Sequence, residues 1–253
     1  NIAFHPDDVE TIYALPWRQS HSGEFMKSTD GGKNWQTLSE PLDIERRLRV
    51  HSIVIDPKDT DTIYFCLPAK STYAPYWHQL KGNQPGVYKS VDGGYNWEIM
   101  NKGLPSHASV TELVFDPADS SILYAALLAD GDTVGGLYKS TDNADTWKKI
   151  ALPSTIEQVN HLHIDNYGRF YLATGKLTGD LEDGGGVWIS DDKGENWKRI
   201  FQMPFIRKAT TASYNPDRIL VDVKLPNSFL TPSLADTDDL RGKINPGVYL
   251  SED

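Results

Sequence analysis

The sequence predicts an all-β repeat fold built from four-stranded antiparallel units, and three observations support this prediction. An eight-residue motif with the pattern S-x-D-x-G-x-x-W recurs along the chain. Upstream of each copy lie two β-rich runs separated by a short turn rich in Asp, Asn, Pro or Gly. Successive motif serines are 50 to 62 residues apart, a spacing typical of propeller blades or solenoid repeats.

The repeated motif has four full copies, at 28–35, 90–97, 140–147 and 190–197, and residues 251–253 fit the start of a fifth. Its Asp can accept backbone N–H bonds in a tight turn, and its Gly can supply a positive φ. We therefore expect each copy to form the turn between the third and fourth strands, with its Trp largely buried between units. The structural residues assigned in this way are Ser28, Asp30, Gly32, Trp35, Ser90, Asp92, Gly94, Trp97, Ser140, Asp142, Trp147, Ser190, Asp192, Gly194 and Trp197. Ala144 replaces the Gly of the third copy, which leaves the geometry of that turn open.

This motif resembles the Asp box, or BNR repeat, of β-propellers such as xyloglucanase-type glycoside hydrolases, sialidases and sortilin receptors. The resemblance covers nearly the whole chain and implies a β-propeller, with about five blades present, as part of a larger propeller. It says less about function, because propellers of this kind include enzymes, receptors and assembly factors.

Each unit is expected to contain a first strand, a return strand, a third strand and a fourth strand that begins at the motif Trp. Runs such as 52–55 and 62–65 are rich in Ile, Val and Tyr, which favour strands, and Asp56-Pro57 marks the turn between them. The predicted blades are about 1–40, 49–101, 109–152, 157–202 and 207–253, all within one propeller region (1–253), and the last blade lacks its fourth strand.

Composition excludes several classes of function. A formal net charge of −10 argues against a nucleic-acid or anionic-membrane surface, and no apolar run reaches the roughly 20 residues that a membrane helix needs. The single cysteine, Cys66, is expected to be a buried structural thiol. No cofactor motif or metal motif is present, and His161 and His163 are not expected to hold a metal together. Because the chain starts at Asn1, we expect a processed or excised piece, with further blades or domains of the same protein.

Length varies mainly between the second and third strands, and in an up-and-down blade those loops lie on the face opposite the motif turns. Exposed aromatic rings beside polar side chains suit sugar rings. The alternative is that the rings fold inward and pin their own loops. The candidate ligand-binding residues are Trp17, Arg18, His21, Tyr73, Tyr76, Trp77 and His78.

Acidic residues in the later loops could supply the carboxylate pair of a glycoside hydrolase, or they could be solvated loop charges. These candidates are Asp130, Asp132, Asp180, Glu182 and Asp183. The sequence thus favours an extracellular or cell-surface propeller that binds or hydrolyses a polysaccharide or oligosaccharide, and it leaves open whether the chain is an enzyme. The alternative is a non-catalytic, sortilin-like propeller or secreted scaffold that binds a protein or peptide.

Overall fold

The computed structural model describes residues 2–14, 25–39, 50–68, 85–129, 135–176, 185–212, 215–223 and 247–250. Every regular element within these ranges is a β-strand. The same residues contain no helix of the length and apolarity that a membrane span requires.

The described strands form five antiparallel sheets. The first contains β1 (Ile2–Phe4), β2 (Ile12–Ala14), β3 (Phe25–Ser28) and β4 (Gln36–Ser39). The second contains β5 (Ser52–Ile55), β6 (Ile63–Leu67), β7 (Gly86–Ser90) and β8 (Glu98–Ile99). The third contains β9 (Ser109–Asp116), β10 (Asp119–Leu128), β11 (Gly136–Ser140) and β12 (Lys148–Lys149). The fourth contains β13 (Val159–Ile164), β14 (Phe170–Thr174), β15 (Gly186–Ser190) and β16 (Lys198–Gln202). The fifth contains β17 (Ile206–Ala212), β18 (Asn215–Val223) and β19 (Gly247–Leu250).

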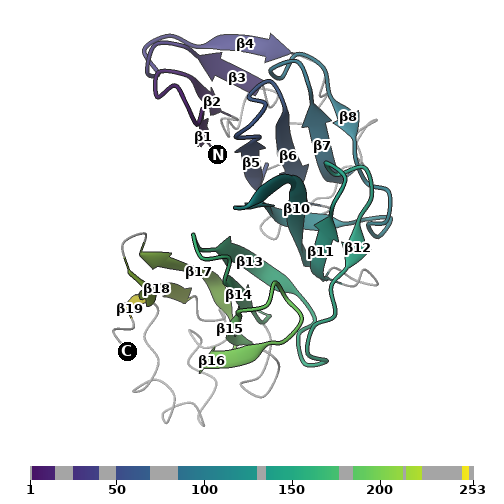
Figure 1. Cartoon of the computed structure of the whole chain (residues 1–253), viewed down its shortest axis with the longest axis vertical. Coiled ribbons are helices and arrows are strands. Elements are labelled where there is room, and N and C mark those ends of the chain that lie inside the picture. The colour runs from purple at the N-terminus through teal and green to yellow at the C-terminus, as the bar shows by residue number, and fades with distance from the viewer. Residues whose placement is uncertain are drawn as a thin grey trace, which may run out of the picture.

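Each sheet pairs its strands in chain order, which confirms the predicted all-β class with four-stranded antiparallel units and an incomplete last unit. The sheets follow one another in an arc, and the fourth strands β4, β8, β12 and β16 lie along its outside (Figure 1). The first strand of each sheet contacts the first strand of the next, from β1 through β5, β9 and β13 to β17. This is the arrangement of propeller blades around an axis. The exact blade boundaries and the grouping of residues 1–253 into one propeller region stay predictions, because some boundaries fall outside the described ranges.

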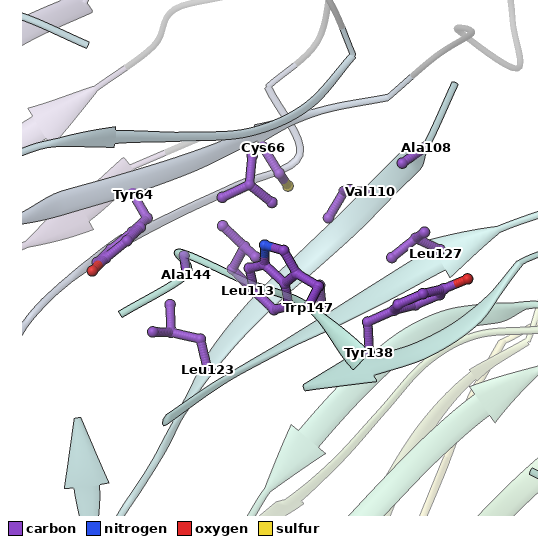
Figure 2. Close-up of a cluster of buried hydrophobic side chains, with 12 residues drawn as sticks. Tyr64, Cys66, Ala108, Val110, Leu113, Leu123, Leu127, Tyr138, Ala144 and Trp147 are labelled. Carbon is purple, nitrogen blue, oxygen red and sulfur yellow. The ribbon is translucent and has the colours of Figure 1, made fainter. Parts of the chain in front are cut away.

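The hydrophobic core lies between the sheets, since the second strands of the first four sheets are largely buried on both faces. All five residues of β6 are buried. Successive side chains of a strand point to opposite faces, so Phe65 packs in a cluster shared with the first sheet, whereas Tyr64 and Cys66 pack against the third. Figure 2 shows this second cluster, with Trp147 of the third sheet in its middle. Neighbouring sheets thus supply each other's apolar environment.

The predicted hairpins between the first and second strands close on an aspartate. Asp56, Asp116 and Asp165 are each buried, and each accepts a hydrogen bond from the backbone N–H two residues later, at 2.8–3.0 Å. Such Asx turns let a carboxylate replace the backbone acceptor that the turn lacks. Asp116 also accepts a hydrogen bond from Lys193 Nζ (3.0 Å), which belongs to the motif of the next sheet.

The repeated motif occupies the turn between the third and fourth strands in the first four sheets, as predicted. Its Asp accepts a hydrogen bond from the backbone N–H four residues later, and its Ser Oγ also accepts one from the backbone N–H at the fourth following position. The first set comprises Asp30–Asn34 (2.8 Å), Asp92–Asn96 (2.9 Å), Asp142–Thr146 (2.9 Å) and Asp192–Asn196 (2.8 Å). The second comprises Ser28–Gly32, Ser90–Gly94, Ser140–Ala144 and Ser190–Gly194 at 2.8–2.9 Å. The N–H of Asn34 stabilises the Asp30 carboxylate and is the largest cause that lowers its pKa to about 2.

The expectation that all four motif tryptophans are largely buried is wrong for Trp35, which is 37% exposed. Trp97 packs edge-on against Phe25 and Phe65, with ring centroids 4.9 and 4.6 Å away, and so wedges between the first two sheets. Trp147 is only 3% exposed, and its Nε1 donates to the Met100 carbonyl of the preceding sheet (2.8 Å). Burial therefore depends on a preceding sheet, and none precedes the first sheet among the described residues.

Ala144 adopts the positive φ that its turn requires, at 71°. The reason an alanine fits lies in the preceding sheet. A Cβ on Gly94 would lie 2.6 Å from a ring carbon of Phe25. Phe25 stands three residues before the motif Ser of the first sheet. The equivalent residue of the second sheet is the smaller Val87, which shares a buried cluster with Ala144 of the third sheet.

Replacing Trp97 with alanine should lower the free energy of unfolding by about 3 kcal/mol, because it removes a ring packed between two sheets. The matched change Trp35→Ala should cost about 1 kcal/mol or less, as expected for an exposed position. Equilibrium denaturation of the 253-residue chain measures both. Equal losses for the two variants would contradict the wedge role of Trp97.

Gly94→Ala should destabilise the chain by about 2–4 kcal/mol, since it adds a clash with Phe25 to a positive φ of 96°. The reverse change Ala144→Gly removes about 1 kcal/mol of backbone strain and a buried methyl of similar worth. Its unfolding free energy should stay within about 1 kcal/mol of the parent. A tolerated Gly94→Ala would show that the Phe25 ring yields to the added methyl.

Candidate functional site

The candidate ligand and acidic residues of the sequence analysis lie outside the described residues. These are Trp17, Arg18, His21, Tyr73, Tyr76, Trp77, His78, Asp130, Asp132, Asp180, Glu182 and Asp183. The strand ends on either side of these segments show at which edge of the sheet each segment is attached. Leu67 pairs with Gly86, Leu127 with Gly136 and Thr174 with Gly186, so each connection leaves and re-enters its sheet at one edge. This edge is opposite the motif turns.

The first strands begin at the same edge, and there they carry polar residues. Ser52, Glu112, His161 and Lys208 occupy equivalent positions on β5, β9, β13 and β17. Each pairs with the corresponding residue of its second strand: Cys66, Ala126, Ala173 and Asp222 respectively. We call these four residues the inner-strand cluster.

A β-bulge precedes three members of the inner-strand cluster. The register shifts leave Thr111, Asn160 and Arg207 as extra residues on β9, β13 and β17. A bulge bends its strand and re-aims the neighbouring side chain, and bulges often lie next to functional sites. Asn160 also ties two sheets together, because its Nδ2 donates to the carbonyls of Gly175 (2.9 Å) and Ile206 (2.8 Å).

The members of the inner-strand cluster meet across the sheet boundaries. The Ser52 hydroxyl donates to Glu112 Oε1 at 3.4 Å, and Glu112 Oε2 lies 3.7 Å from His161 Nε2. Lys208 is exposed and acts electrostatically on both Glu112 and His161. One residue from each of four consecutive sheets therefore contributes to a single polar group.

Burial is the largest cause of the pKa shifts of Glu112 and His161 in the inner-strand cluster. It raises the pKa of Glu112 to about 7, against the opposing effects of Lys208 and the Ser52 hydrogen bond. Burial also lowers the pKa of His161 to about 3, with Lys208 and His163 acting in the same direction. His161 is thus neutral at pH 7, while Glu112 is divided between its protonated and ionised forms. Among the described residues, His161 Nδ1 is a buried polar atom without a hydrogen-bond partner.

His163 lies between sheets, where its Nε2 is 2.8 Å from the Thr211 hydroxyl and its ring packs on Tyr171. The described ranges contain no group of three His, Cys, Asp or Glu side chains arranged to hold a metal. Cys66 is fully buried, as expected. Burial is the largest cause that raises the pKa of its thiol, and the charge of Glu112 raises this pKa further.

The sequence analysis did not single out Glu112, nor did it group His161 with it, although a signal was present. Ser52, Glu112 and His161 each stand four residues before the buried turn aspartate of their hairpin, at 56, 116 and 165. A polar residue repeated at one position of an apolar strand indicates a shared polar layer in a repeat protein.

The curated proteins that this chain resembles in sequence include several xyloglucanases. The chain matches no protein-family model. It is similar to a xyloglucanase of Paenibacillus sp, with 23% identity over 254 residues, 92% of this chain and 24% of that protein. It is 31% identical to xyloglucanase Xgh74A of Acetivibrio thermocellus over 157 residues, 59% of this chain and 17% of that protein.

Among solved structures, the chain resembles an ancestral GH74 enzyme with a TM-score of 0.65 and 18% identity, over 99% of this chain and 29% of the other. A likeness at this identity shows the fold, which is that of a β-propeller. The chain spans under a third of the length of each of these three proteins.

Proposed function

We propose that this chain is part of a carbohydrate-active propeller of the glycoside-hydrolase type, with xyloglucan as the first substrate to test. The observation that carries the proposal is the likeness to a Paenibacillus xyloglucanase along 92% of the chain. A match of that extent covers most of the sheets and of the segments between them. It is therefore not limited to the repeated motif, which other propellers can share.

The glycan would lie on the edge of the sheets opposite the motif turns. Rigid, mutually buried sheets position the strand ends there, and binding residues on such scaffolds usually come from the connecting segments. Those segments carry Tyr73, Tyr76 and Trp77, whose rings would stack on sugar faces, and Arg18 and His78, which would bond to hydroxyl groups.

Hydrolysis would need two carboxyl groups on opposite sides of the scissile bond, one as general acid and one as general base or nucleophile. Asp130, Asp132, Asp180, Glu182 and Asp183 are the candidates within this chain. Because the chain spans only part of its relatives, either group could also come from another part of the same protein. A binding role without hydrolysis by this chain alone is consistent with the proposal.

The repeated motif would be an Asp box, as in sialidase and sortilin propellers. A protein that acts on a plant or microbial polysaccharide would work outside the cell, so we place it in the extracellular space or at the cell surface.

The double variant Tyr76→Ala and Trp77→Ala should weaken binding of xyloglucan oligosaccharides by about 1–3 kcal/mol, since it removes two stacking rings. Isothermal titration calorimetry measures the affinity, and thermal unfolding checks that the fold is kept. Tyr167→Ala is the matched control, because Tyr167 is 77% exposed in the turn between β13 and β14, at the opposite edge of the sheet.

A panel of polysaccharides with product detection separates the outcomes. Cleavage or binding of xyloglucan by the parent chain supports the proposal, and cleavage would identify an enzyme. Binding to none of the glycans, in the presence of a cooperative unfolding transition, would overturn the proposal for this part of the protein. If Tyr167→Ala weakened binding as much as the double variant, the glycan would lie on the motif edge instead.

A further inference from the structure

The inner-strand cluster is costly as a purely structural feature. Apolar residues would be the ordinary choice at positions where neighbouring sheets pack, because a buried polar group costs free energy unless it is hydrogen-bonded. Here Glu112 is only weakly bonded, through a Ser52 hydroxyl at 3.4 Å. His161 Nδ1 makes no well-formed hydrogen bond, and the backbone of Ala209 only partly offsets the effect of burial on the pKa of the ring. The four sheets nevertheless place these side chains at one register position.

We propose that the inner-strand cluster is a pH-sensitive junction that couples the second, third, fourth and fifth sheets. The geometry supports this, since Ser52, Glu112, His161 and Lys208 come from four consecutive first strands and interact across the boundaries between them. A change of charge on one member alters its interactions with neighbours on other sheets. The junction is independent of the proposed glycan activity.

The charged and titratable groups around Glu112 come from each packed element. Strand β13 contributes His161 and His163, β17 contributes Lys208, and β6 contributes Cys66. Strand β5 contributes the uncharged Ser52, with His51 just before it. Three further charged residues lie at the motif edge, away from Glu112. There Asp119 of β10 bonds to Ser121, Lys89 of β7 bonds to the Asn143 carbonyl, and Asp116 of β9 bonds to Lys193. Among the described residues, Lys208 is the cation whose charge acts on Glu112.

Glu112 and His161, both partly buried, give opposite dependences of stability on pH. The folded pKa of Glu112, about 7, is above its ordinary value of 4.5, so its contribution to stability is complete below pH 4.5 and is lost as the pH rises to 7. The folded pKa of His161, about 3, is below its ordinary value of 6.5, so its contribution is complete above pH 6.5 and is lost as the pH falls towards 3. Glu112 therefore contributes to the loss of stability on the alkaline side, whereas His161 contributes on the acid side together with the turn aspartates, whose pKa values are also lowered.

The test is urea unfolding of the 253-residue chain at several pH values between 4.5 and 8.5. Glu112→Gln keeps the neutral form of the side chain at every pH. Relative to this variant, the parent's unfolding equilibrium constant should increase by on the order of 100-fold from pH 4.5 to 8.5, the size that the two pKa values of Glu112 imply. Glu98→Gln, at an exposed position of β8, is the matched control and should follow the parent.

Lys208→Met supplies a second arm that does not depend on Glu112→Gln folding well. Lys208 is exposed and favours the ionised form of Glu112, so its removal should make the loss of stability on the alkaline side larger than in the parent. Lys198→Met, on the exposed start of β16, is its control and should leave the profile unchanged. Parallel pH profiles for the parent, Glu112→Gln and Lys208→Met would overturn the proposal. Where Glu112→Gln does not fold, a steeper alkaline loss in Lys208→Met than in the parent, with Lys198→Met unchanged, supports the proposal; equal profiles for Lys208→Met and the parent overturn it.

Discussion

Burial of the face of one sheet against the next is the constraint on which the rest of this structure depends. A single four-stranded sheet has little stability in water without another layer to cover it. In this chain the second strands are largely apolar, and alternate side chains of strands such as β6 and β14 enter the clusters on either side. Each sheet is therefore stable only between its neighbours, and the chain's stability resides in its boundaries between sheets.

The same constraint determines where chemistry can take place. Because the faces of the sheets are covered, side chains that meet a ligand must lie at the strand ends or in the connections. One edge is occupied by motif turns whose polar groups bond to one another, as in the bonds of Asp92 with Asn96 and of Ser90 with Gly94. The opposite edge holds the ends of the connections that vary in length, together with the polar starts of the first strands. This asymmetry is the physical basis for placing the glycan there.

Most of the fold could be predicted from the sequence, because its determinants are local and repeated. The motif gave the third-to-fourth-strand turns, and the Asp turns gave the hairpins between first and second strands. What could not be predicted depends on a neighbouring sheet. Trp35 has the same motif as Trp97 but differs in exposure, since only Trp97 has a described sheet on that side. The inner-strand cluster is of the same kind, because Glu112 and His161 are 49 positions apart and meet only when two sheets pack.

The close approach of Gly94 to Phe25 has a consequence for how such a protein can evolve or be redesigned. The size of a residue in one repeat limits the residue allowed in the turn of the next, as the combination of Val87 with Ala144 also illustrates. A duplicated or transplanted repeat would bring a turn fitted to its former neighbour. Successful recombination should therefore exchange segments cut through the middle of a sheet, so that each matched boundary travels intact. The boundary between two repeats is thus the unit that must be kept together, and the matched residues at each boundary limit the order in which the repeats can stand.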